Sequence, residues 1–139
     1  MKIAVDFDGT IVEHKYPSIG KERPFACETL RQLSADGHKL ILWTVRSGGL
    51  LEEALDWCRR RGLNFYAVNS NYPTGSLFEG SKEVSPKIEA DVYIDDRNLG
   101  GLPDWGEIYN MICNKSQAKR KHSGRRHAPR WFRKLFSNG

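Results

Sequence analysis

The stretch KIAVDFDGT, residues 2–10, decides how the rest of the chain is arranged. Within its first six residues, Ile3, Ala4, Val5 and Phe7 form a nearly continuous apolar run, which is typical of a strand buried on both faces of a parallel sheet. The run leads into two carboxylates, Asp6 and Asp8, with a glycine and a threonine directly after them. Two charges at the end of a buried strand cost free energy to keep side by side, and a bound cation removes that cost. The alternative is an ordinary strand followed by an Asp-Gly turn.

Composition restricts the class of protein. The chain has 139 residues, 39% of them hydrophobic and 28% charged, which predicts one soluble globular domain with a sizeable core. No apolar run has membrane-spanning length and no signal-peptide pattern is present, so we expect a cytoplasmic protein. Its widely spaced cysteines, Cys27, Cys58 and Cys113, form no CxxC pattern and indicate reduced thiols.

The net charge of +5 is unevenly distributed. Residues 115–139 hold nine of the 22 basic residues and no acid, so residues 1–114 keep 13 basic and 17 acidic residues and carry −4. We therefore predict two parts, a catalytic domain over residues 1–114 and a basic, partly disordered tail over residues 115–139.

Apolar runs alternate with helical patterns after the first strand. In order, we expect a flap over 11–23, a helix over 24–37, a strand over 39–43, a helix over 50–62, a strand over 64–68, a polar loop over 69–86, a strand over 91–94 and a last helix capped by Asp104. This alternation predicts an α/β protein with a mostly parallel sheet covered by helices. Right-handed crossovers bring several strand ends to one edge of such a sheet.

Acidic residues follow both the first and the last expected strand. These are Asp6 and Asp8, and then Asp95 and Asp96. Carboxylates gathered at one sheet edge suit a hard, oxygen-preferring cation such as Mg²⁺, whose coordination a substrate phosphate completes. We therefore predict a Mg²⁺ site made by these four residues.

Two further residues fit phosphoryl chemistry at the same edge. Thr44 ends the second strand and Lys87 precedes the last one, and a hydroxyl and an ammonium both bind phosphoryl oxygens. Asp6 can attack phosphorus to form an aspartyl-phosphate. Asp8 can protonate the leaving oxygen and then activate the water that hydrolyses the intermediate.

The motifs DFDGT at 6–10, Thr44, Lys87 and Asp95–Asp96 resemble, in this order, the four motifs of the haloacid dehalogenase (HAD) superfamily. The resemblance covers roughly residues 1–112. It implies a Rossmann-like three-layer sandwich and Mg²⁺-dependent phosphoryl chemistry. A two-component receiver domain is a poorer match because it has its paired acids early and its threonine and lysine late.

The resemblance also implies a role for each motif residue. Asp6 matches the nucleophile, and Asp8 matches the acid–base residue, whose main-chain carbonyl also binds the metal. An acid at this second position is typical of the phosphatase branch. We therefore expect a phosphatase, with a catalytically inactive scaffold as a less favoured reading.

The remaining motif residues match phosphate and metal ligands. Thr44 and Lys87 match the phosphate-binding hydroxyl and cation, with Lys82 as the substitute for the lysine. Of the acidic pair, Asp96 matches the direct metal ligand and Asp95 a water or ligand holder, although the sequence leaves this order open.

The gaps between the motifs are too short for a full cap domain. We therefore expect a capless protein, in which loops or the second subunit of a homo-oligomer exclude water. Such an open site admits a phosphorylated small molecule or macromolecule. The stretch IDDR at 94–97 resembles deoxyribonucleotidase-type phosphatases and indicates a nucleotide.

Two other side chains have two readings each. Arg46 and Asn69 are candidate substrate contacts, or else a solvated arginine and an ordinary loop residue. Trp43 and Trp57 are expected in the core.

The tail also has two readings. Residues 115–129 are expected to be disordered, whereas 130–136 (RWFRKLF) place four large apolar residues among cations. This segment fits contact with nucleic acid or an anionic membrane, or docking on its own domain or a sister subunit. The first reading gives the alternative function, a nucleic-acid- or membrane-associated binding protein in which the HAD-like body is secondary.

Overall fold

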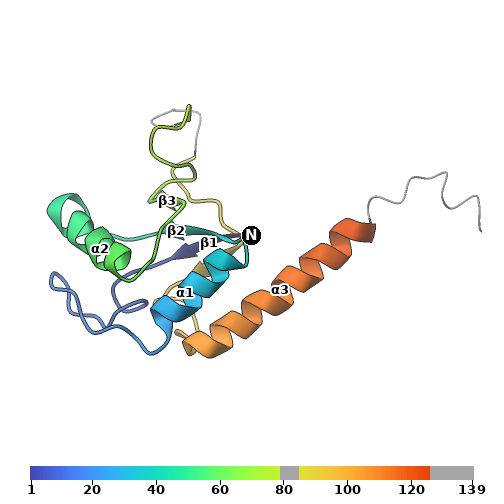
Figure 1. The fold of residues 1–139 in the computed structure, drawn as a ribbon, viewed down its shortest axis with the longest axis horizontal. Helices are drawn as coiled ribbons and strands as arrows, with labels where there is room; N and C mark the ends of the chain where they lie inside the picture. The colour runs from blue at the N-terminus through green and yellow to red at the C-terminus, as the bar shows by residue number, and fades with distance from the viewer. Residues whose placement is uncertain (79–84, 126–139) are drawn as a thin grey trace, which may run out of the picture.

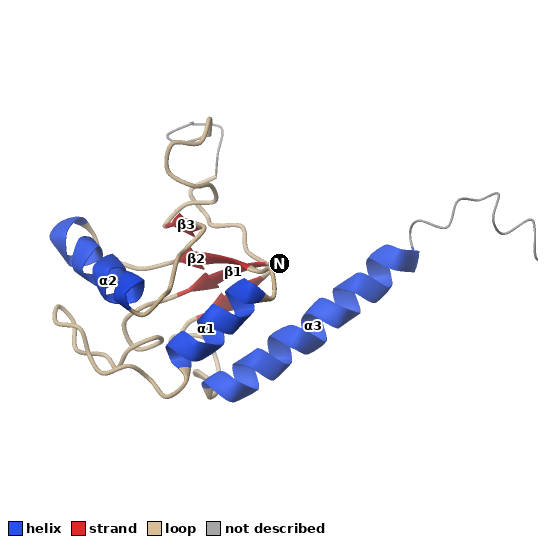
Figure 2. Cartoon of the chain, in the orientation of Figure 1, coloured by secondary structure: helices blue, strands red, loops and turns tan. Residues whose placement is uncertain are grey.

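The computed structural model describes residues 1–78 and 85–125. Its elements, in chain order, are β1 (Lys2–Val5), α1 (Ala26–Ala35), β2 (Lys39–Leu42), α2 (Gly48–Arg60), β3 (Ala67–Val68), β4 (Val92–Ile94) and α3 (Trp105–Arg125). The strands form one sheet in the order β3-β2-β1-β4, and every strand pair is parallel (Figure 1, Figure 2). The α/β fold and the parallel sheet are thus confirmed.

The strand β1 lies inside the sheet because both of its faces are apolar. Ile3 and Val5 point into the larger core, where Leu40 and Leu42 of β2 are their paired neighbours. Ala4, between them, points to the opposite face, together with a smaller cluster of Ile41, Ala67 and Ile88. This alternation is the period of two that a strand imposes on its side chains.

All three helices pack into the larger core. Their buried residues there are Ala26, Cys27, Leu30 and Leu33 from α1, Ala54, Trp57 and Cys58 from α2, and Trp105, Ile108 and Ile112 from α3. The helices α1 and α3 lie side by side (Figure 1). The opposite face is covered by Ile88 and Ala90, which lie between β3 and β4, and at its side by Tyr66, which directly precedes β3. The sandwich is therefore Rossmann-like, and its third layer is the connection between β3 and β4, whose described residues include no helix.

The last helix begins as expected and ends later than expected. The Asp104 carboxylate accepts a hydrogen bond from the Glu107 N–H at 2.9 Å, which is the predicted N-cap. The helix then continues to Arg125, and Lys119 forms an ion pair with Asp91. The expectation of a disordered segment from residue 115 is wrong as far as residue 125, and the boundary at residue 114 falls inside a helix.

The apolar segment 130–136 of the predicted tail lies outside the described residues. Among the residues that are described, no helix has both the length and the apolar character to span a bilayer.

Candidate functional site

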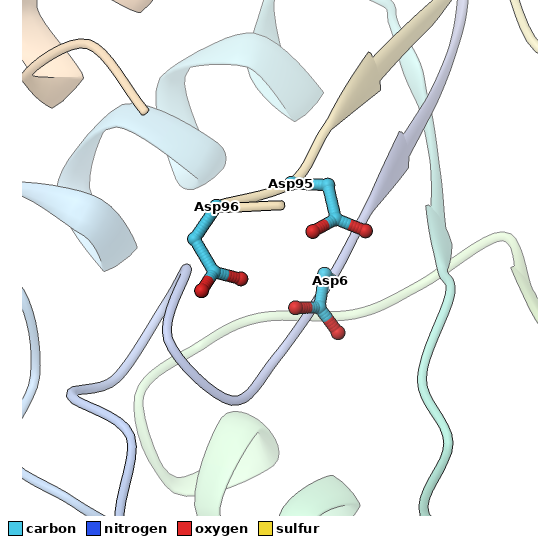
Figure 3. A group of neighbouring side chains, drawn as sticks. All are labelled: Asp6, Asp95 and Asp96. Atoms are coloured by element: carbon cyan, nitrogen blue, oxygen red, sulfur yellow. The ribbon is translucent and has the colours of Figure 1, made fainter. Parts of the chain in front are cut away.

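Neighbouring strands bring three carboxylates to one point. The strands β1 and β4 pair in register up to Val5 and Ile94, and the Asp6 N–H extends the ladder by donating to the Ile94 carbonyl at 3.0 Å. The residues that follow therefore leave the sheet together. Asp6, Asp95 and Asp96 each offer an oxygen, and these oxygens lie within 4.8 Å of one another (Figure 3).

A buried threonine and a glycine fix this arrangement. The Thr10 hydroxyl lies 3.2 Å from an oxygen of Asp6 and 3.2 Å from an oxygen of Asp96, and it accepts the Asp96 N–H at 3.0 Å. Its single proton serves one carboxylate at a time. Gly9 has φ +83°, and a Cβ atom there would lie 2.5 Å from an Asp96 oxygen. Only glycine allows the Asp96 carboxylate to approach the loop so closely.

The electrostatics of the cluster favour a cation. Burial, followed by repulsion from Asp95 and in smaller part from Asp96, raises the pKa of Asp6 to about 7, although hydrogen bonds from Phe7 and Thr10 act in the opposite direction. Two unit charges 4.8 Å apart repel by about 1 kcal/mol in water and about 3 kcal/mol at an effective dielectric constant of 20. A hard divalent ion prefers carboxylate oxygens and removes this repulsion. The chemistry of the donor set therefore fits Mg²⁺.

The other acid of the DFDGT motif has a different partner. Arg46 donates to both oxygens of Asp8, from Nε and Nη2, at 2.8 Å each, and the exposed fractions of the two side chains are 0% and 7%. This is the fork geometry of a bidentate pair. The side chain of Asp8 is thus held by Arg46 and is not part of the three-carboxylate cluster.

Arg46 also holds the predicted flap. Its remaining N–H groups donate to the carbonyls of Pro17 at 3.0 Å, Ser18 at 2.9 Å and Leu50 at 3.5 Å. The guanidinium also lies over the Tyr16 ring, 5.2 Å from its centre. Every donor of this side chain has an acceptor in the protein, so Arg46 positions Asp8 and the flap. The reading as a solvated loop arginine is therefore wrong.

A pocket of about 230 Å³ opens beside the cluster. It is lined by Asp6, Asp8, His14, Trp43, Thr44, Val45, Asp95 and Arg97. Thr44, the predicted phosphate ligand, is one of these lining residues. Its hydroxyl accepts the Arg46 N–H at 3.1 Å, and its own N–H donates to the Asn69 side-chain oxygen at 2.8 Å. Asn69 thus fixes the backbone after β2 and does not line the pocket.

The predicted lysine lies elsewhere. Lys87 is exposed on the segment before β4 and does not line the pocket, and Lys82 lies outside the described residues. The pocket-lining residues instead include Arg97, which directly follows Asp96. That adjacency is the sequence signal that identifies it.

The pocket also uses a tryptophan that the sequence places in the core. Trp43 is 38% exposed and lines the pocket, so the core expectation is wrong for this residue. Trp57 is 7% exposed and packs edge-on against Phe7, as expected of a core residue. Trp43 lies directly before Thr44, and a residue next to a predicted phosphate ligand is a natural candidate for the pocket wall.

Comparison with known proteins identifies a relative of this chain and gives no information on its chemistry. No protein-family model matches the sequence, and no curated protein is significantly similar to it. A solved structure, that of the conserved protein coded by a locus from Bacteroides thetaiotaomicron, superposes with a TM-score of 0.77 at 60% sequence identity, covering 83% of this chain and 91% of that chain. The chain therefore belongs to the same family as this conserved protein of Bacteroides thetaiotaomicron.

Proposed function

We propose that this protein is a Mg²⁺-dependent phosphomonoester hydrolase of the HAD type that acts through an aspartyl-phosphate on Asp6. The observation that carries the proposal is the gathering of three carboxylates within 4.8 Å, at the ends of two paired strands. The three side chains are only half-buried, yet they lie close enough to repel one another, and a bound cation removes this repulsion.

The proposed ion is held by Asp6, Asp95 and Asp96. When bound, it supplies positive charge that offsets the repulsion between a carboxylate nucleophile and a phosphate dianion. Thr10 and Gly9 keep Asp6 and Asp96 in place, and the Asp95 carboxylate accepts the Arg97 N–H at 2.8 Å.

The residues of the pocket divide the reaction between them. A carboxylate oxygen of Asp6 attacks phosphorus, the bond from phosphorus to the leaving oxygen breaks, and the substrate alcohol departs with a proton. Water then attacks the phosphorus of the aspartyl-phosphate, which releases inorganic phosphate and restores Asp6. Thr44 and Arg97 bind phosphoryl oxygens in both steps, and Arg97 takes the part that the sequence assigns to Lys87.

Asp8 is the proton carrier of this scheme. It lines the pocket next to Asp6, so it is placed to give a proton to the leaving oxygen and to take one from the attacking water. Both of its oxygens accept hydrogen bonds from Arg46. A proton on Asp8 replaces one of these bonds, so Asp8 meets the leaving oxygen with one arm of the pair open. Loss of that proton to the leaving oxygen restores the arm, and uptake of a proton from the attacking water opens it again.

The size of the pocket limits what it encloses. About 230 Å³ holds a phosphoryl group and little more of a nucleotide or sugar phosphate. The rest of the substrate then lies outside, against Trp43 and the 82% exposed Val45. A nucleotide, another small phosphomonoester or a phosphorylated macromolecule all satisfy this geometry.

The test is release of inorganic phosphate from a panel of nucleotides, sugar phosphates and phosphopeptides, with Mg²⁺ and with a chelator. The wild type is expected to turn over part of the panel only with Mg²⁺, and Asp6→Asn is expected to lose the activity. Asp56→Asn, an exposed acid of α2, is the matched control and should retain it. Absence of Mg²⁺-dependent turnover across the panel overturns the proposal.

A second candidate function is supported by the charge of α3. Its last turns carry exposed Lys115, Arg120 and Lys121, and no acid lies beyond residue 114. Such a surface fits an RNA, a DNA or an anionic membrane. Binding that weakens with salt and is lost when the chain ends at residue 114 supports this function, and failure to bind at low salt excludes it.

A further inference from the structure

An apolar groove next to the acidic pocket lies along the free edge of the sheet. The sheet ends at β4, and a groove of about 290 Å³ runs between this strand, the turn after it and the first turns of α3. The groove is apolar at its base and at its rim, with Ile94, Ile108 and Ile112 buried and Tyr93, Leu99 and Met111 exposed. Leu99 is fully exposed and Met111 is 55% exposed. Contiguous apolar surface of this kind marks an interaction site.

The edge of β4 indicates what kind of occupant fits. The carbonyl of Ile94 points toward β1, where it accepts the Asp6 N–H, so the carbonyl of Tyr93 points outward. The Asn98 side chain already donates to this outward carbonyl at 3.2 Å. The strand is also only three residues long. The edge is therefore closed to an added strand, and the occupant must contribute apolar side chains.

The chain itself contains such side chains beyond α3. Within residues 115–139 the only large apolar residues are Trp131, Phe132, Leu135 and Phe136, all in the seven-residue segment 130–136. Left in water, four such side chains keep a large apolar area exposed, and burial of each is worth about 1.5–3 kcal/mol. Burial of these side chains in the groove would remove both apolar surfaces from water.

The connecting length is sufficient. From Met111 to Arg125 the helix rises about 21 Å, at about 1.5 Å per residue. An extended chain covers about 3.3 Å per residue, so Leu135 reaches up to about 33 Å from the end of the helix. Leu135 and Phe136 therefore reach Met111 with length left for the reversal of direction, whereas Trp131 reaches about 20 Å and covers the helix just beyond the groove.

Charge favours the same placement. Asp95 lines both the groove and the acidic pocket, so an acid stands at the border between them. The segment carries Arg133 and Lys134 directly before Leu135. Insertion of Leu135 into the groove brings these cations toward Asp95 and the neighbouring carboxylates.

From these observations we propose that residues 130–136 of the same chain occupy the groove between β4 and α3. The groove is then an intramolecular docking site, and its occupant arrives with its cations next to the acidic pocket. This inference is independent of the proposed phosphatase activity.

Amide hydrogen exchange of the full-length protein, read by mass spectrometry, tests the docking. We expect exchange in residues 130–136 to be at least about tenfold slower than in an unstructured chain. This protection should be independent of protein concentration and lost in both Met111→Glu and Leu99→Glu. Leu77→Glu, a change at a side chain that is 98% exposed on another surface, is the matched control and should keep it.

Three outcomes overturn the proposal. Exchange at the unstructured rate in the wild type shows that the segment does not dock. Protection that disappears on dilution assigns the groove to a second copy of the chain. Protection that survives both groove variants places the segment elsewhere. Because the Leu99 side chain is fully exposed, its variant retains the fold even if Met111→Glu does not.

Discussion

Replacement of Arg46 by methionine is the perturbation whose size the structure determines best. The change removes a fully buried side chain that donates to both oxygens of Asp8. It leaves Asp8, 7% exposed, without its partner, and it frees the carbonyls of Pro17 and Ser18. Removal of one member of a buried ion pair costs about 3–5 kcal/mol because the remaining charge is uncompensated. We expect the free energy of unfolding to fall by about 4 kcal/mol, a large part of what a domain of this size has.

The assay is urea denaturation at pH 7 on four proteins. These are the wild type, Arg46→Met, Asp8→Asn and the double variant. Because the double variant leaves no buried charge unpaired, it should be more stable than the sum of the single changes predicts, by at least about 1 kcal/mol. Arg59→Met is the matched control. Arg59 is 57% exposed and pairs with Asp56 and Glu52 on the surface, so its loss should cost less than about 1 kcal/mol.

Two results refute this reasoning. One is an Arg46→Met variant no less stable than Arg59→Met. The other is strict additivity of the Arg46 and Asp8 changes, which means that the two side chains do not stabilise each other.

Three further predictions concern the acidic site. The pKa of Asp6 is raised from 3.8 to about 7 in the folded protein, so the metal-free wild type should lose stability relative to Asp6→Asn as the pH rises from 4 to 8. Thermal denaturation in chelator should give the two proteins equal stability near pH 4 and show the full difference at pH 8. A stability difference that does not change with pH contradicts the raised pKa. Gly9→Ala should destabilise the fold by about 2 kcal/mol and weaken Mg²⁺ binding, measured by calorimetry. The control is Gly37→Ala, because Gly37 also has a positive φ, +89°, but an added Cβ there meets no atom within 4 Å, so Mg²⁺ binding should be unchanged. Equal effects of the two changes contradict a close approach by Asp96. Arg97→Met should lower kcat/KM for the best phosphomonoester by about 10–100-fold, as expected for loss of a charged hydrogen bond. The control Arg60→Met, on the exposed end of α2, should leave kcat/KM unchanged. Equal kinetics for the two variants show that Arg97 does not bind the phosphate.

The strands and the acidic cluster follow from local sequence patterns. The apolar run before Asp6 and the one before Asp95 both predict buried strands, and parallel pairing forces the residues after them to the same edge. The N-cap at Asp104 is equally local, because it depends on one side chain and the helix that follows. Each of these features is determined within a few residues.

The role of Arg46 has no such local signal. An arginine in a short loop looks the same in sequence whether water solvates it or the fold buries it. Its partner Asp8 lies 38 residues away, and the flap carbonyls come from a third segment. Only the assembled tertiary structure brings these groups together.

The long final helix shows that a strongly basic composition can be mistaken for disorder in a segment with high helix propensity. Residues 115–125 are rich in Lys and Arg, and this composition alone is typical of disorder. The same residues, with Gln117 and Ala118, are good helix formers, and the helix starts on a firmly packed Trp105. Once the first turns are anchored, extension costs little, because nucleation is the expensive step.

The proposal that Asp6 is the nucleophile of a Mg²⁺-dependent phosphatase is tested most directly by trapping its intermediate. The enzyme is mixed with a phosphomonoester that it hydrolyses, quenched with borohydride, digested and analysed by mass spectrometry, since borohydride reduces an acyl phosphate of aspartate to homoserine. The account predicts homoserine at Asp6, only when Mg²⁺ and substrate are both present. Turnover without modification at Asp6, or modification of another acid in its place, contradicts it.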